Sequence, residues 1–297
     1  MDYRELGPGQ ISRLWIADLS DHDPEVVFES ADMLIEAPNW TLDGSALIVN
    51  GNGALWRLDL EDRLLVQIPF EGLPPINNDH VLHPNGEDVF LSAVDGQIYR
   101  GSLRGGAVTR VTGDGPPELH FLHGVSPDGE TLAYVGVEPE GGDMWARANI
   151  FTTPAAGGAD RRLTDTESPA DGPEYSPDGE WIYFNTEQFG EVSGHAQIAR
   201  MRPDGSSLEQ LTDDDGVNWF PHWAPDGRTA VYLRYPQGTR GHPADLEVEL
   251  ELVEGADWTA PRTRARVFGG QGTINVNSWA PTSDRFAYVE YPIALPV

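Results

Sequence analysis

A short turn motif recurs six times in this chain, and its spacing limits the fold more than any other feature. Each copy follows, with local departures, the order aromatic or apolar residue, small or polar residue, Pro, Asp or Asn, and Gly. A short apolar segment follows each copy. The third positions of the six copies are Leu42, Pro84, Pro127, Pro177, Pro225 and Pro281. These positions are 42 to 56 residues apart, which is the length of a four-stranded propeller blade.

The chemistry of the motif is that of a hairpin turn, as its third copy, residues 125–129, illustrates. Pro127 presets φ for a turn, Asp128 bonds its own backbone, and Gly129 supplies a positive φ. An apolar strand precedes each turn and a second one follows it. A third strand comes later, and a fourth ends in a Leu-Thr or Val-Thr pair such as Leu163-Thr164. Each repeat therefore predicts four strands, which we call A, B, C and D in chain order.

The two ends of the chain complete the last repeat. Residues 285–289 have the pattern of a strand B, whereas residues 14–19 and 25–28 have the patterns of strands C and D. Pairing the ends removes the edge strands that an open array would expose. We therefore predict an all-β, six-bladed propeller with four-stranded antiparallel blades and one domain, residues 1–297. The predicted blades are residues 36–68, 78–111, 120–163, 171–212, 218–268, and 275–291 together with 11–29.

The motif, its spacing and the closing Leu-Thr pair resemble the repeats of TolB-like propellers, which are also called WD40-like or PD40 repeats. Segments 218–227, 241–243 and 268–279 look like those of uncharacterised bacterial TolB-like proteins. The resemblance covers essentially the whole chain and implies the same six-bladed fold. TolB itself is a periplasmic protein of the Tol–Pal envelope system with an extra N-terminal domain. This sequence shows neither a secretory signal nor such a domain, so we do not expect that role.

The composition limits both the chemistry that the protein can perform and its expected location in the cell. Cysteine is absent, which excludes disulfides, thiolate metal sites and cysteine nucleophiles. The first residues lack a basic stretch followed by an apolar one, and no apolar run reaches the roughly 18 residues of a membrane helix. We therefore expect a cytoplasmic protein that makes no membrane contact. A periplasmic location would require that a signal had been removed.

The chain is strongly acidic, with a formal net charge of −29 from 48 acidic side chains and 19 arginines, and it contains no lysine. Such a surface repels nucleic acid and anionic membranes. It suits metal ions or cationic partners. The same composition also arises in a salt-adapted protein or in a genome that favours arginine and acidic residues.

Strand A of a blade lines the central channel, so the residues just before each motif are predicted to converge on one funnel. The B–C loops at the same end are longest at residues 138–147, 187–194 and 236–243, and they wall one side of it. Loops on a rigid scaffold are where binding sites concentrate. The predicted ligand-binding residues are Glu36, Asn78, His120, Asp171, His195, Asn218, Trp219, Arg240, His242, Gln271, Asn275 and Asn277.

Several side chains near these loops have two interpretations. Arg147, Arg234 and Arg240 could hold an anionic ligand, or they could pair with the abundant local acids. Trp145 and Trp219 could stack on a sugar or a base, or they could anchor strands and loops. The segment 269–272 is rich in glycine but leads into a strand rather than a helix, so it is interpreted as a tight loop and not as a phosphate cradle.

Histidines at nearly equivalent blade positions suggest a metal site. His80, His123 and His222 each precede a motif, and neutral imidazoles with carboxylate or amide ligands suit Mn, Fe, Ni or Zn. We therefore predict a divalent metal there. The alternative is that these histidines cap strand ends and bond to backbone or water. His83 replaces the motif's Ser and is predicted to be part of the turn, whereas His22 is predicted to be solvated.

Three functions stay open at this point. The first is binding of a small polar ligand, a carbohydrate or a peptide, in the funnel. The second is a metal-dependent, lyase-type enzyme for acidic sugars, because oligogalacturonate lyases are similar propellers with a metal on funnel histidines. The third is a monomeric scaffold that binds a protein on its loop-rich face. Gly-x-Ser-x-Gly, His-Glu-x-x-His and Walker motifs are absent, which argues against the corresponding hydrolases and nucleotide-binding proteins.

Overall fold

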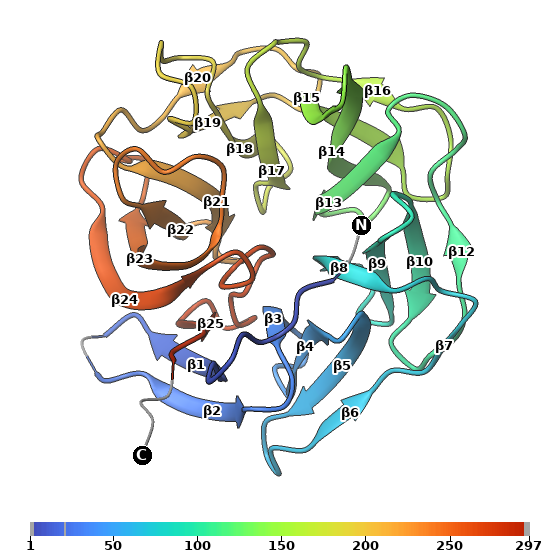
Figure 1. Ribbon diagram of the computed structural model, residues 1–297, viewed down its shortest axis with the longest axis vertical. Coiled ribbons are helices and arrows are strands. Elements are labelled where there is room, and N and C mark those ends of the chain that lie inside the picture. The colour runs from blue at the N-terminus through green and yellow to red at the C-terminus, as the bar shows by residue number, and fades with distance from the viewer. Residues whose placement is uncertain (1–2, 21, 294–297) are drawn as a thin grey trace.

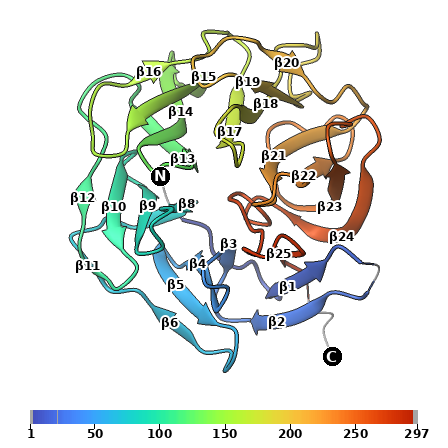
Figure 2. The same ribbon diagram turned by 180° about the vertical axis from the view of Figure 1, so that it is seen from behind.

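The computed structural model, which describes residues 3–20 and 22–293, is a ring of six antiparallel β-sheets around a central channel (Figure 1). The view from behind shows the same closed ring (Figure 2). The described residues contain strands and turns but no helix, and hence no helix that could span a membrane. The prediction of an all-β, six-bladed propeller is therefore confirmed.

Blades one to five each have four strands, and the innermost comes first in the chain. Blade one has β3 (Ile35–Trp40), β4 (Ala46–Gly51), β5 (Ala54–Asp59) and β6 (Leu65–Gln67). Blade two has β8 (Ile76–Leu82), β9 (Asp88–Ala93), β10 (Ile98–Ser102) and β12 (Thr109–Arg110). Blade three has β13 (Leu119–Val125), β14 (Thr131–Glu140), β15 (Asp143–Pro154) and β16 (Arg161–Arg162).

Blades four and five continue the pattern. Blade four has β17 (Ala170–Tyr175), β18 (Ile182–Thr186), β19 (Gln197–Met201) and β20 (Glu209–Gln210). Blade five has β21 (Val217–Trp223), β22 (Thr229–Tyr235), β23 (Ala244–Glu254) and β24 (Arg262–Gly270). A short parallel pair, β7 (Phe70–Glu71) with β11 (Gly106–Ala107), joins the outer parts of blades one and two.

The sixth blade closes the ring with strands from both ends of the chain, as predicted. β25 (Arg285–Glu290) pairs with β1 (Ser12–Asp18), which pairs with β2 (Glu25–Ser30). At the innermost position a single bridge between Trp279 and Phe286 takes the place of a full strand. The channel wall is therefore less regular in this blade, where residues 271–278 form turns and bends rather than a strand.

The turn motif has the hydrogen bonds that its sequence predicts. In the third copy, the Ser126 hydroxyl donates to Asp128 Oδ1 at 2.5 Å and accepts from the Thr131 backbone N–H at 2.9 Å. Gly129 has a φ of 78° and donates its N–H to Ser126 O at 2.7 Å. In the second copy His83 replaces the serine, and its Nδ1 atom lies 3.0 Å from the Asn85 backbone N–H. The prediction that His83 belongs to the turn is confirmed.

The hydrophobic core lies between neighbouring blades rather than in one central cluster. Strands β4 and β18 are buried along their whole length because blades cover both of their faces. Aromatic side chains fill the gaps between blades, as where Trp223 of blade five contacts Tyr183 of blade four with ring centroids 5.4 Å apart. This packing fixes the blades, and with them the strands that line the channel.

Each of the five complete innermost strands contains a β-bulge, at a register shift between Glu36 and Asn39 in β3 and at matching places in β8, β13, β17 and β21. In three blades the bulge holds a residue with positive φ, namely Ala37 (52°), Gly172 (64°) and Phe220 (54°). A bulge adds one residue and redirects the side chains after it. Side-chain direction in the channel therefore does not follow simple alternation.

Candidate functional site

A cavity of about 170 Å³ occupies the end of the channel where the innermost strands begin, and we call it the funnel. It collects side chains from all six blades and from the segment before β1. The lining residues are Tyr3, Arg4, Glu36, Asn77, Asn78, Asp79, Phe121, His123, Trp145, Asp171, His242, Gln271 and Asn275.

A regular sequence position supplies much of this lining. It is the residue six places before the third position of each motif, which is Glu36, Asn78, Phe121, Asp171, Trp219 and Asn275 in the six blades. Five of these residues line the funnel, and the sixth, Trp219, packs against the lining residue His242 with ring centroids 4.5 Å apart. In blades one, three, four and five this position precedes the bulge and in blade two it lies within the bulge, and its side chain lines the funnel in every blade but the fifth.

Two aspartates and two histidines form the most polar part of the funnel, which we call the floor: Asp79, His123, Asp171 and His242. His123 Nε2 lies 3.2 Å from Asp171 Oδ1 and 4.0 Å from Asp79 Oδ1. His242 Nε2 lies 3.7 Å from Asp171 Oδ2. The backbone N–H of Gly172 also donates to Asp171 Oδ1, at 2.6 Å. Asp171 therefore connects the two histidines.

Burial and mutual attraction set the charges of the floor. Burial opposes protonation of His123, but the carboxylates of Asp79 and Asp171 outweigh it and raise the pKa of His123 to about 9. Burial raises the pKa of Asp79 to about 6 in spite of His123. Burial would also raise the pKa of Asp171, but the hydrogen bond and charge of His123 lower it below the usual value. Near neutral pH the floor thus holds an imidazolium beside ionised carboxylates.

Arg4 and Glu36 form the opposite side of the funnel. An Arg4 guanidinium N–H donates to Glu36 Oε1 at 2.6 Å and to the Gln271 carbonyl at 2.5 Å. Glu36 also accepts from Asn50 at 3.0 Å and from Asn78 at 3.3 Å. Burial raises the pKa of the Glu36 carboxyl despite the neighbouring guanidinium. Arg4 comes from the segment before β1, which runs across the opening of the ring (Figure 1).

Aromatic rings form a wall above the floor. Trp145, from the hairpin between β14 and β15, stacks on Phe121 with ring centroids 5.2 Å apart and keeps 43% of its surface exposed. Below them, Phe220 contacts the rings of His123 and His242 at 5.6 and 5.2 Å. A buried Phe with positive φ is strained, and the surrounding structure maintains that strain. Phe220 therefore fixes the positions of both floor histidines.

The structure does not bring the predicted metal triad together, because its three histidines have separate partners. His80 is fully buried, its Nε2 lies 3.3 Å from the Ile48 carbonyl, and burial lowers its pKa to about 4. His222 contacts Glu174 through Nδ1 and the Ile274 carbonyl through Nε2. His123 alone lines the funnel. Across residues 3–20 and 22–293, no group of three or more His, Asp or Glu side chains is arranged to hold a metal ion.

The other predicted ligand-binding residues divide into two groups. Glu36, Asn78, Asp171, His242, Gln271 and Asn275 line the funnel. The remaining six lie elsewhere, and the first three have structural partners. His120 Nδ1 lies 2.7 Å from the Gly96 carbonyl, and His195 Nε2 lies 2.8 Å from the Asp214 carbonyl. Asn218 is fully buried and donates to Asp214 Oδ2 at 3.0 Å.

The last three residues lie outside the funnel for different reasons. Trp219 is 4% exposed and packs behind His242. Arg240 is exposed and lies against Gly194 of the neighbouring loop. Asn277 donates to Glu174 Oε1 at 2.7 Å and lines the opposite end of the channel. Arg240 and Asn277 lie outside the strands, whereas Trp219 holds the same repeat position as the lining residues, so the repeat alone does not fix side-chain direction.

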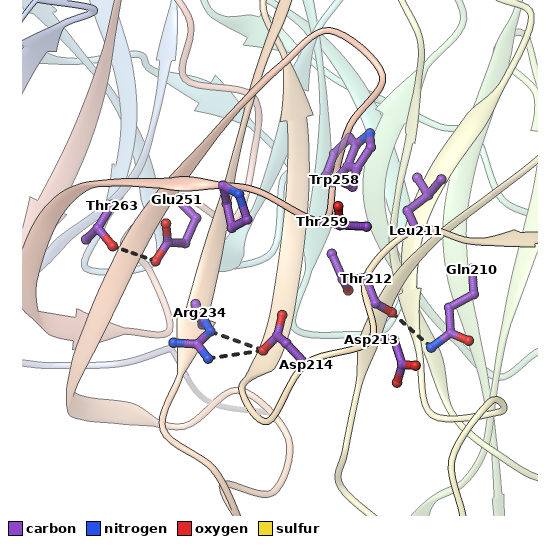
Figure 3. Close-up of a pocket in the computed structure, with 11 residues that line it drawn as sticks. Gln210, Leu211, Thr212, Asp213, Asp214, Arg234, Glu251, Trp258, Thr259 and Thr263 are labelled. Atoms are coloured by element: carbon purple, nitrogen blue, oxygen red, sulfur yellow. Dashed lines mark hydrogen bonds and ion pairs between the residues drawn. The ribbon is translucent and has the colours of Figure 1, made fainter.

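Further cavities lie outside the funnel. The opposite end of the channel has a cavity of about 360 Å³, which we call the lower mouth, lined largely by motif residues such as Trp40, Pro127, Trp223 and Trp279. A third, of about 400 Å³, lies between blades four and five (Figure 3). There Asp214 and Glu249 hold Arg234, at 3.1 and 3.0 Å, so this arginine pairs with local acids.

Comparisons with known proteins agree with this architecture. The family model of the TolB beta propeller domain, PD40, matches residues 123–251. An uncharacterised protein of Agrobacterium fabrum, Atu1656, is 37% identical over 292 residues, which are 96% of this chain and 94% of that protein. A solved structure from Agrobacterium tumefaciens, provisionally called TolB, has a TM-score of 0.86 at 36% identity, covering 97% of this chain and 99% of that one. The chain belongs to the TolB-like β-propeller family.

An enzyme with the same fold is a more distant neighbour. An oligogalacturonate lyase in complex with manganese has a TM-score of 0.57 at 15% identity, covering 90% of this chain and 75% of that one. Identity at this level shows that the fold is shared and nothing about the site.

Sequence reasoning undervalued some of the residues that matter most in the funnel. Asp79 directly follows Asn78, the residue six places before the third motif position of blade two. Nothing in the repeat indicates that the Asp79 carboxylate lies near His123. Phe121 holds that position itself, so a strict alignment of the motifs would have found it. Tyr3 and Arg4 belong to no repeat, and only the closed ring brings their segment over the channel.

Proposed function

We propose that this protein binds a small polar ligand, a carbohydrate or a peptide, in the funnel. The observation that carries the proposal is one cavity lined both by the carboxylates and imidazoles of the floor and by an aromatic pair, the buried Phe121 and the exposed Trp145. Polar groups at fixed positions orient a ligand, and an exposed indole supplies contact area at low entropic cost. Side chains from different blades hold the site rigid.

The amide side chains extend this chemistry. Asn78, Asn275 and Gln271 line the cavity, and Gln271 links them by hydrogen bonds of 3.2 Å to each. Amides can both donate to and accept from hydroxyl or peptide groups. The lining therefore suits a ligand rich in hydrogen-bonding groups.

The second candidate, a metal-dependent lyase for acidic sugars, receives less support from the geometry. It needs a set of metal ligands, and none is arranged within the described residues. It also needs a cation for the sugar carboxylate, whereas Arg4, the arginine in the described lining, is already paired with Glu36. We therefore do not propose a reaction.

The proposal is tested by calorimetric titration with neutral oligosaccharides and short peptides. Trp145→Ala removes the exposed ring of the wall and should weaken binding about tenfold, since such contacts contribute on the order of 1 kcal/mol. The matched control is Leu42→Ala, which removes a side chain that is 53% exposed at the lower mouth. Binding that survives Trp145→Ala and Asn275→Ala unchanged would contradict a funnel site and favour a protein partner on the rim.

A further inference from the structure

The charges that line the funnel do not balance. Three carboxylates, those of Glu36, Asp79 and Asp171, line the cavity beside a single guanidinium in its described lining, that of Arg4. His123 supplies a second positive charge, through its contact with Asp171 at 3.2 Å. The three carboxylates therefore outnumber the one guanidinium, and the remaining ionisable groups of the described lining include the imidazoles of His123 and His242, the latter 3.7 Å from Asp171 Oδ2. The net charge of −29 adds a long-range field that concentrates cations around the protein.

Of the three carboxylates, Asp79 accepts the fewest hydrogen bonds within the described chain. Its Oδ2 atom accepts from Asn77 Nδ2 at 2.7 Å. Within the described chain its Oδ1 atom has no hydrogen-bond donor, since His123 Nε2 is 4.0 Å away. The residue is only 4% exposed. Asp79 lines the cavity, so a ligand N–H in the cavity could donate to this oxygen.

The chain itself shows that the funnel accepts an organic cation. The Arg4 guanidinium contacts Glu36, lies 2.5 Å from the Gln271 carbonyl, and stacks over the Tyr291 ring at 5.0 Å. Carboxylate, carbonyl and aromatic face together form a typical guanidinium site. Asp79 and Asp171 line the same cavity as Phe121 and Trp145, so carboxylates and aromatic rings are again close together there. The imidazoles beside these two carboxylates are those of His123 and His242.

We propose that the ligand of the funnel carries a guanidinium or primary ammonium group, and that Asp79 and Asp171 bind this group beside the Phe121–Trp145 pair. The inference rests on the proposed binding function of the funnel. The cavity of about 170 Å³ has room for roughly five water volumes, which is a head group rather than a whole ligand. The rest of the ligand then extends past Trp145 toward solvent.

Matched probes separate charge from shape. Acetyl-arginine-amide and acetyl-citrulline-amide have side chains of almost equal shape, but only the first is charged. We expect calorimetric titration to show at least tenfold tighter binding of the arginine compound, because a charge-assisted hydrogen bond in a buried site is lost with citrulline. Asp79→Asn should remove most of this preference. Asp213→Asn, the matched control, removes one charge at an exposed position outside the funnel and should leave the preference intact.

Two further experiments test where the cationic group binds and whether it belongs to a peptide or to a free amine. Arg4→Ala removes the internal guanidinium and should leave the arginine-to-citrulline preference in place or increase it. Tighter binding of acetyl-Ala-Arg-Ala-amide than of agmatine identifies a peptide as the source, whereas the reverse order identifies a free amine. Both orders support the proposal, and thermal unfolding of each variant checks that it is folded.

Three results would overturn the inference. The first is equal binding of the arginine and citrulline compounds, and the second is a preference that Asp79→Asn does not reduce in a folded variant. In the third, neutral oligosaccharides bind in a Trp145-dependent way while every cationic probe fails, so the proposed function stands and the inference fails. If neither neutral nor cationic probes bind at the funnel, the proposed function fails as well.

Discussion

The two ends of the central channel are built from the same six repeats, yet they differ in kind. The lower mouth is lined by the turn motifs themselves, so it is nearly uniform, with Pro127, Pro177, Pro225 and Pro281 at equivalent positions. The funnel is lined mostly by residues that precede the motifs, and their types vary from blade to blade, with asparagine recurring in blades two and six. His123 lines both cavities and separates them.

The difference shows which residues the fold requires and which it leaves to function. A turn needs a fixed φ and a fixed side-chain hydrogen bond, so the motif must repeat. The start of an innermost strand needs only to pair with its neighbour, which leaves its channel-facing side chain open to variation. Variation within a repeat therefore marks the candidate site, whereas uniformity marks the scaffold.

The largest expected effect is on stability at the lower mouth. Trp223→Ala should lower the free energy of unfolding by about 3–5 kcal/mol, because the side chain is 7% exposed and packs on Tyr183 and Trp258. Trp145→Ala in the funnel should cost less than about 1 kcal/mol, because that ring is largely exposed. Urea denaturation measures both variants. Equal losses in the free energy of unfolding would contradict the view that the lower mouth is structural and the funnel is the binding site.

A smaller effect is expected from pH. The folded pKa of His123 is about 9, above the ordinary value of 6.5, so its stabilisation is complete below pH 6.5 and is lost as pH rises through 9. The loss is about 3 kcal/mol at 1.36 kcal/mol per pKa unit. Asp79, with a pKa raised to about 6, also favours the folded state less as pH rises, but in the window from about pH 4 to 6.

Asp171→Asn tests the origin of this pH dependence. Without the Asp171 carboxylate, the free energy of unfolding should change less between pH 6.5 and 9 than in the unaltered protein, as measured by denaturant titration at both pH values. Asp213→Asn serves as the control for the loss of one charge. A steep dependence that persists in Asp171→Asn would show that another group titrates.

Arg4→Ala should cost about 1–2 kcal/mol, because it leaves the buried Glu36 carboxylate without its guanidinium partner. Since an unpaired Glu36 has a higher pKa, its stabilising contribution is lost as pH rises, and the cost should be greater at pH 8 than at pH 5. Denaturant titration at the two pH values measures this. Arg104→Ala is the control, since Arg104 is 84% exposed and should change stability by less than about 0.5 kcal/mol.

The smallest expected effect comes from restoring the motif in blade two. His83→Ser should change stability by no more than about 0.5 kcal/mol, because the bond that His83 Nδ1 accepts from the Asn85 N–H can be replaced by the one that a motif serine accepts, as Ser126 does from the Thr131 N–H. Thermal unfolding is sensitive enough to detect the difference. A loss above about 1.5 kcal/mol would mean that contact of the His83 ring with Phe90, at 5.7 Å, matters more than the turn.

Much of the candidate site could be predicted from the repeat alone. Glu36, Asn78, Asp171 and Asn275 lie at a constant distance from the motif, and all four line the funnel. His80 and His222 do not converge with His123, because the bulges that precede them change the direction of their side chains, so equivalent sequence positions do not point to the same place. In β8 the five residues from Ile76 to His80 lie opposite three of the partner strand, whereas in β21 the four residues from Trp219 to His222 do so.

The sequence by itself determined the number of blades, the turn chemistry and the closure of the ring from both chain ends. These follow from local rules, since a Pro-Asp-Gly turn and an apolar strand need few distant contacts to be recognised. Only the tertiary structure decided that Asp79 would meet His123, that Phe220 would be strained between two histidines, and that Arg4 would reach Glu36. Each of these contacts joins residues far apart in the chain, and their geometry is fixed by ring closure and by bulges, which no local pattern records.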